Sequence, residues 1–208
     1  MFFTEEKLRK YVKELHKFIY QESLNLEKFR YLKTTGSSSE EAPIYAMPSF
    51  DDSNWEELPI GSMWGGRDQA IWLRASVEIP ENWRAHKVAL NINLGQRAEG
   101  LVFLNGQPVQ GVDWRHFEVL IPANLKEQGR LDIAIRAWSG MASSLRQLTH
   151  AQLVLINEDA EDLYFRASTM WDAINVLDSN DYNRQLLTRI LDEAVNMLDF
   201  RNPGSPMF

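Results

Sequence analysis

The sequence predicts a mainly β protein, in which a β-sandwich of the jelly-roll type is flanked by helices. Three runs of strict alternation predict it: residues 71–79, 87–94 and 131–137 each place apolar side chains on one face. Such alternation is what strands with one buried and one solvated face require. The Asn105-Gly106 pair tolerates positive φ at both central turn positions and predicts a tight hairpin. Many short strands separated by turn signals favour a sandwich or jelly roll.

The N-terminal segment, residues 1–33, is predicted to be helical. Thr4 is a suitable N-cap with acidic residues behind it, and apolar residues recur at helical spacing as far as Ile19. A second apolar pattern is interpreted as a continuation or restart of this helix: Leu24, Leu26, Phe29 and Leu32. Residues 34–48 are predicted to be a linker, polar in its first part, and the sandwich is predicted to span residues 49–157.

After residue 157 the apolar period returns to about 3.6 residues. Residues 158–200 are therefore predicted to form two helices, with a break at residues 178–181 where Asn180 or Asp181 can cap the second helix. So short a connection predicts that the two helices are antiparallel neighbours. Residues 201–208 are predicted to be an irregular tail, because they contain Pro203, Gly204 and Pro206.

The composition argues against several classes of function. The net charge is −7, and the sequence offers no stripe of basic residues that could neutralise phosphate groups, so no nucleic-acid partner is expected. The absence of cysteine and the isolated positions of the four histidines predict no metal site within the chain. No apolar run reaches membrane length and no secretory pattern opens the sequence, so we expect a cytoplasmic protein without a membrane partner. A structural calcium ion on loop acids such as Asp51, Asp52 or Asp113 is left open.

No catalytic constellation is evident. The adjacent acidic pairs are interpreted as solvated or helix-starting acids, because a glycosidase needs two carboxylates that face each other across a cleft. The sequence contains neither a nucleophile elbow nor a phosphate-binding loop.

Two clusters that combine tryptophan with polar residues are candidate carbohydrate or interdomain contacts. The first contains Trp64, Arg67 and Asp68 around a Gly-Gly pair, and the second contains Trp114 and His116. An exposed aromatic ring can stack on the C–H face of a sugar while neighbouring polar groups bond its hydroxyls. The competing interpretation is that these tryptophans pack the sandwich itself or a neighbouring domain.

The order of the short motifs in the sandwich resembles that in a known family. Asp51-Asp52-Ser53-Asn54-Trp55 is followed by Trp72-Leu73-Arg74, Pro80-Glu81-Asn82-Trp83 and Asn105-Gly106. This order is similar to that of the galactose-binding-like jelly-roll accessory domains of large glycosidases. With the flanking helices and the segment 61–68, it resembles the N-terminal region of family 38 glycoside hydrolases, the class II α-mannosidases.

The resemblance implies a non-catalytic accessory domain of an enzyme that hydrolyses α-mannosides. The zinc-binding motif of that family, Gly-His-x-His-x-Asp-x-x-Trp, has no counterpart here. No catalytic residue therefore carries over, no cofactor is expected in this chain, and zinc is implied only for a catalytic domain beyond it.

The expected partner is that catalytic domain of the same full-length chain, with segment 64–69 nearest to it or to the substrate entrance, since a Gly-Gly backbone suits close approach. The alternatives are a free-standing carbohydrate-binding module with mannosides or galactosides as ligands, and a module that forms homo-oligomers through its helical faces.

Overall fold

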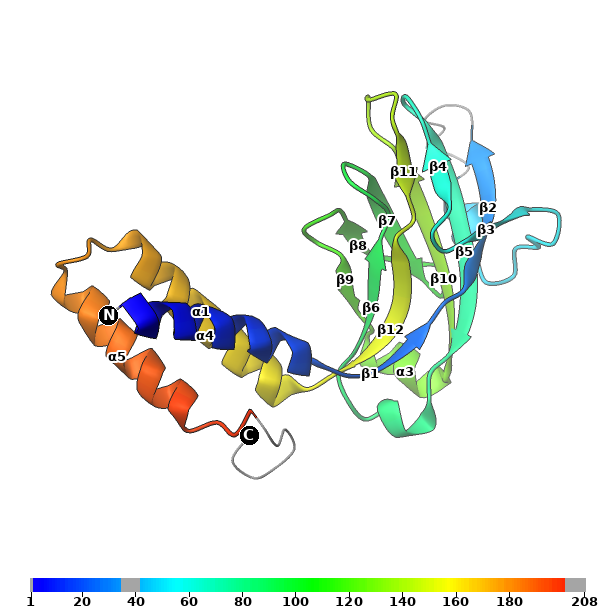
Figure 1. Cartoon of the computed structure of the whole chain (residues 1–208). Helices are drawn as coiled ribbons and strands as arrows, with labels where there is room; N and C mark the ends of the chain where they lie inside the picture. Colours follow the sequence, from blue (N-terminus) through cyan, green and yellow to red (C-terminus); the bar gives the residue numbers. More distant parts are fainter. Residues whose placement is uncertain (1, 35–41, 201–208) are drawn as a thin grey trace. The chain divides into compact units, whose positions relative to one another are not determined.

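The computed structural model describes residues 2–34 and 42–200 of the chain (Figure 1). Glu22–Ile156 is one compact unit, and the parts of the chain before and after it form a second. The first unit is a β-sandwich and the second consists of helices. This confirms the predicted class, a mainly β jelly-roll protein with flanking helices.

The sandwich is built from two main sheets (Figure 1). The six-stranded sheet has the order β3 (Glu56–Pro59), β2 (Lys28–Thr34), β5 (Ala70–Glu78), β10 (Arg130–Trp138), β7 (Glu99–Leu104) and β8 (Gln107–Val112). The four-stranded sheet has the order β1 (Tyr20–Asn25), β12 (His150–Ile156), β6 (Val88–Asn93) and β9 (Glu118–Leu120). A separate pair joins β11 (Leu145–Gln147) to β4 (Met63–Gly65). Two short helices, α2 (Ala42–Ala46) and α3 (Ala123–Gln128), and a 3-10 turn at Glu81–Trp83 lie in its connections.

The core between the sheets uses the alternating positions that the sequence predicts. Leu73 of β5, Leu90 of β6 and Ile135 of β10 are completely buried in one cluster. The predicted hairpin at Asn105-Gly106 connects β7 to β8, and both residues have positive φ (47° and 83°), as a tight turn of this kind requires.

The outer face of the six-stranded sheet differs from the prediction, because its centre is covered. Trp72 and Arg74, expected on a solvated face, are only 2% and 7% exposed. Helix α2 and residues 50–55 cross this face, and their apolar side chains form a second cluster with the sheet: Tyr45, Ala46, Phe50, Trp55, Trp72, Phe103 and Ala134. Because another part of the chain supplies this cover, the alternation of residues within β5 could not predict it.

The prediction of helix up to residue 33 is wrong. Helix α1 (Phe2–Leu15) ends in a 3-10 turn at His16–Phe18, and the chain then forms β1 and β2. Strand β2 pairs with both β3 and β5, and its Phe29 and Tyr31 alternate into the core. The sandwich therefore begins well before residue 49, and the predicted linker contains α2; residues 35–41 of that linker lie outside the described residues.

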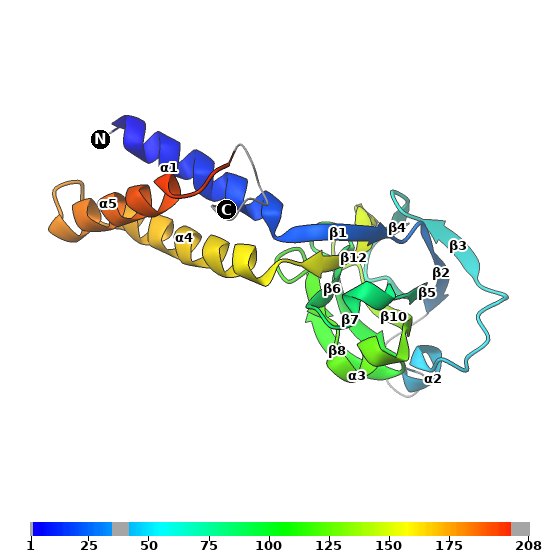
Figure 2. The ribbon, with the colours of Figure 1, turned by 90° about the horizontal axis from the view of Figure 1, so that it is seen from below.

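The helical unit packs α1 against α4 (Glu158–Val176) and α5 (Tyr182–Asn196), as Figure 2 shows. The helix pair predicted after residue 157 is confirmed, with Asn157 and Asp181 as the two N-caps. The core of the unit contains Leu8, Leu15 and Leu191. No described helix is long and apolar enough to cross a membrane. The predicted tail, residues 201–208, lies outside the described residues.

Candidate functional site

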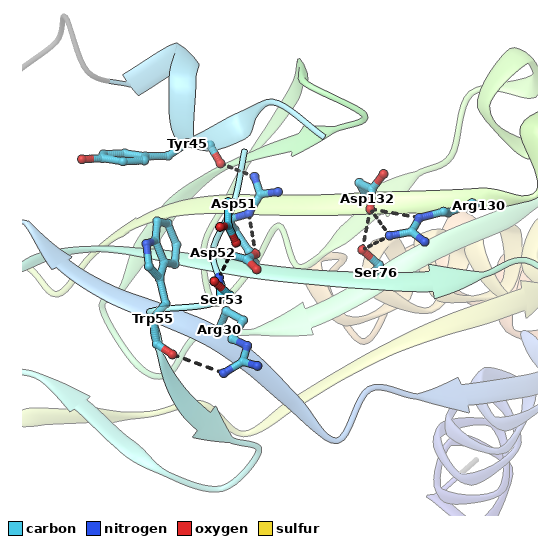
Figure 3. Close-up of polar contacts among 10 residues, drawn as sticks. Arg30, Tyr45, Asp51, Asp52, Ser53, Trp55, Ser76, Arg130 and Asp132 are labelled. Atoms are coloured by element: carbon cyan, nitrogen blue, oxygen red, sulfur yellow. Dashed lines mark hydrogen bonds and ion pairs between the residues drawn. The ribbon is translucent and has the colours of Figure 1, made fainter. Parts of the chain in front are cut away.

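The motif Asp51–Trp55 and its partner Arg74 form a latch on the outer face of the six-stranded sheet (Figure 3). Arg74 Nε donates a hydrogen bond to Asp52 Oδ2 over 2.7 Å, and its Nη1 donates to the backbone carbonyl of Tyr45. The guanidinium carbon lies 5.6 Å from the centroid of the Phe50 ring. A buried arginine thus holds both ends of segment 45–52 to the sheet, which gives these motif residues a structural role.

The remaining contacts of the motif also fix backbone. Arg30 Nη1 donates to the carbonyl of Trp55 over 3.2 Å. Asp51 Oδ1 accepts the backbone N–H of Ser53 over 3.0 Å, and this bond lowers the pKa of the Asp51 carboxyl below its ordinary value. Across residues 2–34 and 42–200, no group of three or more metal-ligating side chains comes together, so the structure offers no assembled calcium or zinc cage there.

Trp64, the first candidate contact residue, belongs to the core. It is 2% exposed, and its indole N–H donates to the carbonyl of Leu94 over 2.9 Å. Gly65 has a φ of 81°, and a Cβ at this position would lie 2.6 Å from Ser139 Cβ. The close approach expected at the Gly-Gly pair is real, but it serves packing within the sandwich. The burial of Trp64 contradicts the expectation that it presents its ring to a sugar or a partner, and agrees with the competing interpretation that it packs the sandwich.

Asp68 and Arg67, from the same segment, are exposed. Asp68 adopts a left-handed conformation (φ 51°), its backbone N–H bonds to the carbonyl of Gly140 over 2.8 Å, and its Oδ1 accepts the indole N–H of Trp138 over 2.9 Å. Asp68 also lines a cleft of about 680 Å³. This carboxylate therefore joins the predicted segment to the end of strand β10.

The cleft lies where the outer face of the six-stranded sheet is left open. Trp138 on β10 stands between Ala70 of β5 and Glu99 of β7 in the strand register, and Arg136 of β10 stands opposite Leu101 of β7. All five residues line the cleft. They point away from the core, because the intervening residues of each strand are buried between the sheets.

The second predicted cluster lies in an exposed loop that is closed by hydrogen bonds to Asp113. Trp114 is 53% exposed, and the Arg115 guanidinium carbon lies 4.4 Å from the centroid of its ring. Asp113 Oδ1 accepts the backbone N–H groups of Arg115 and His116, each over 2.7 Å, and His116 Nδ1 lies 3.1 Å from the same oxygen. The bonds from the backbone N–H groups lower the pKa of the Asp113 carboxyl. None of residues 113–116 lines the cleft at Trp138, so the structure does not bring the two predicted clusters into one site.

The sequence did not identify three residues of the cleft as site residues: Trp138, Glu99 and Arg136. Their outward direction follows from the alternation of β10 and β7, but their proximity depends on the register between these strands, which pairs cleft residues more than thirty positions apart in sequence. The alternation could have indicated that Trp138 faces outward. It could not have paired Trp138 with Asp68.

A separate apolar groove lies on the helical unit. It has a volume of about 500 Å³ and is lined by Phe165, Arg166, Thr169, Met170, Ala173 and Leu187. Phe165 is 57% exposed. Exposed aromatic and aliphatic side chains around a groove are typical of a surface that contacts another protein part.

Comparison with known proteins agrees with this architecture. A family model described as "Alpha-mannosidase, jelly roll domain" matches residues 30–165. A β-glucuronidase from Ruminococcus gnavus matches 67% of this chain over 30% of its own length, with a TM-score of 0.53 and 11% identity. A Lactobacillus rhamnosus β-glucuronidase matches 65% of this chain over 29% of its own, with a TM-score of 0.51 and 10% identity. No curated protein matches the chain.

At such identities the two structures share a fold with this chain and show nothing further. The chain spans 18% to 30% of the length of the matched β-glucuronidase structures.

Proposed function

The chain belongs to the family of alpha-mannosidase jelly roll domains, and from this premise we propose that it is a non-catalytic accessory domain that docks on the catalytic domain of the same full-length enzyme. The family match confirms the resemblance to α-mannosidases that the motif order indicates. In our proposal the parent is a cytoplasmic family 38 glycoside hydrolase that cleaves α-mannosides.

Zinc belongs to the catalytic domain in this proposal. The described part of the chain does not fit a zinc ion, because its histidine and acidic side chains form no group of three that could hold one. The chain is accordingly expected to have no hydrolytic activity of its own.

The observation that carries the docking proposal is the apolar groove between α4 and α5. Phe165 at its edge is more than half exposed, and other apolar residues of the unit are exposed as well: Val176, Tyr182, Ile190 and Met197. Burying an apolar side chain of this size contributes about 1.5–3 kcal/mol, so a large domain docked here would be stabilised mainly by apolar contact.

Substitution of Phe165 tests the docking. We expect Phe165→Glu in the full-length enzyme to lower the temperature of half-inactivation and the kcat/KM for an aryl α-mannoside, because a carboxylate would be buried at the interface. The matched control is Leu120→Glu, which places the same charge at an exposed apolar position of the sandwich and should leave both quantities unchanged. Equal behaviour of the two variants would refute docking through this groove.

The oligomerisation alternative uses the same groove and gives a different result. A dimer of this 208-residue chain that dissociates on dilution, and that Phe165→Glu abolishes in sedimentation experiments, would favour it. A monomer at all concentrations would leave docking within one chain as the explanation of the groove.

We also propose that segment 64–69 borders the substrate entrance. Within this segment Arg67 is the residue to test, because it is exposed whereas Trp64 is buried. Arg67→Ala in the full-length enzyme should lower kcat/KM without changing the unfolding midpoint. Unchanged kinetics would remove segment 64–69 from the entrance. Cell fractionation with an antibody against the chain tests the cytoplasmic location.

A further inference from the structure

We propose that the cleft at Trp138 binds a short, neutral oligosaccharide. The cleft lies within the sandwich unit, on the part of the outer face of the six-stranded sheet that helix α2 and residues 50–55 leave uncovered. Its volume of about 680 Å³ falls within the range of roughly 300–1,000 Å³ that is usual for small-molecule sites.

The indole ring of Trp138 is held in place before any ligand arrives. Its N–H donates to Asp68 Oδ1 over 2.9 Å, and Asp68 is itself held by the bond of its backbone N–H to Gly140. The neighbour of Trp138 on β5 is Ala70, whose methyl group is too small to cover the ring. A fixed and partly exposed indole face suits the C–H face of a pyranose, at little cost in side-chain entropy.

Two charged groups beside the ring are available for hydroxyl groups. Glu99 and Arg136 line the cleft, and the side chain of neither makes a hydrogen bond or an ion pair with any described residue. A carboxylate accepts hydrogen bonds from hydroxyl groups and a guanidinium donates to them, and such charge-assisted bonds are about twice as strong as neutral ones. Together the two side chains can bind neighbouring hydroxyls of one sugar.

The charge balance favours a neutral ligand over an anionic one. Asp68 and Glu99 place two negative charges against the single positive charge of Arg136. A sulfate, phosphate or uronate would meet net repulsion, whereas a polyol would not. The choice of α-mannosides among neutral saccharides rests on the proposed function.

Calorimetric titration of this chain tests the inference. The probes are the α-1,2-, α-1,3- and α-1,6-linked mannobioses, with inorganic sulfate as the anionic comparison. We expect saturable binding of at least one mannobiose and none of sulfate. Glu99→Gln and Arg136→Gln should each weaken binding by about tenfold or more, and neither substitution breaks a side-chain hydrogen bond or ion pair with a described residue.

Two further variants guard the interpretation. Trp138→Ala should abolish binding, and an unchanged circular dichroism spectrum would exclude unfolding as the cause. Trp114→Ala removes an exposed indole outside the cleft and should leave the affinity unchanged. No mannobiose binding at millimolar concentrations, or equal loss in Trp114→Ala, would overturn the inference.

This outcome is separable from that of the proposed function. Glu99→Gln would leave docking intact in the full-length enzyme, whereas Phe165→Glu would leave the mannobiose affinity of this chain intact. Docking without mannobiose binding would therefore remove the saccharide site and keep the accessory-domain function.

Discussion

The contacts of Arg74 allow a sharp prediction about stability, because the same sheet face carries one arginine–aspartate ion pair with a buried arginine and another with an exposed arginine (Figure 3). Arg74 pairs with Asp52 with only 8% of its side chain exposed, whereas Arg130 pairs with Asp132 with 63% of its side chain exposed. Replacing each arginine by methionine removes the charge and keeps an unbranched chain of similar length.

The magnitude follows from what each substitution leaves behind. In Arg74→Met the Tyr45 carbonyl and the Asp52 carboxylate lose their donor, and breaking a fully buried pair in this way costs about 3–5 kcal/mol. The Asp52 side chain is 30% exposed and can be rehydrated, which reduces the expected loss to about 2–3 kcal/mol. Arg130→Met removes an exposed guanidinium, and Asp132, whose side chain is 18% exposed, keeps the hydrogen bond from Ser76 Oγ. The free energy of unfolding should therefore change by no more than about 0.5 kcal/mol.

Urea unfolding followed by tryptophan fluorescence measures both losses. Six of the seven tryptophans lie in the sandwich, so the signal reports mainly on the unit that contains the latch. In thermal unfolding the same loss corresponds to a midpoint about 4–12 °C lower. A cost below about 0.5 kcal/mol for Arg74→Met, or an equal cost for Arg130→Met, would refute the structural role of the motif.

Two further predictions concern a buried tryptophan and a half-buried histidine. Trp64→Phe should lower the free energy of unfolding by about 2 kcal/mol, because it removes ring volume and the N–H that donates to the Leu94 carbonyl. Trp114→Phe, at an exposed site, should change the free energy of unfolding in urea by less than about 0.5 kcal/mol. A larger loss in Trp114→Phe than in Trp64→Phe would contradict the burial of Trp64. Burial holds the pKa of His150 below its ordinary value of 6.5, so the unfolded chain binds a proton that the folded chain does not. The contribution of His150 is therefore complete above 6.5 and lost as the pH falls toward its folded-state pKa. Urea midpoints from about pH 7 to pH 5 should fall less steeply in His150→Gln than in the wild type, and parallel curves would argue against this effect.

The strands that could be predicted are those whose pattern of apolar residues lies within the strand itself. Residues 71–79, 87–94 and 131–137 alternate because each strand has one face in the core, and the inward set can be read from the sequence. The turn at Asn105-Gly106 is equally local, since two adjacent residues determine its geometry. The family resemblance rested on such local motifs.

The segment from residue 20 to residue 33 was not predictable in this way. Leu26, Phe29 and Leu32 recur every three residues, which suits a helix, whereas the burial of Phe29 and Tyr31 follows a period of two. The backbone hydrogen bonds that β2 forms with β3 and β5 decide between the two patterns, and both partners lie far along the chain.

The same distinction separates the parts of the candidate site. The sequence indicated Asp68 and Arg67 from their neighbourhood in one segment. The partner of Asp68, Trp138, lies 70 residues away. Only the pairing of strands brings that tryptophan, Glu99 and Arg136 to one face, which no spacing rule within a segment can reveal.

The helical unit, assembled from both ends of the described chain, constrains how the protein is made. Helix α1 leaves the ribosome before the sandwich, yet α4 and α5, which cover its apolar residues Leu8 and Leu15, follow only after the whole sandwich. At about 5–20 residues per second, this delay lasts on the order of ten seconds. During translation the nascent chain therefore presents an amphipathic helix without partners, a form that chaperones bind and that aggregates when they are scarce. The sandwich can finish folding before the helices that enclose it in sequence have met.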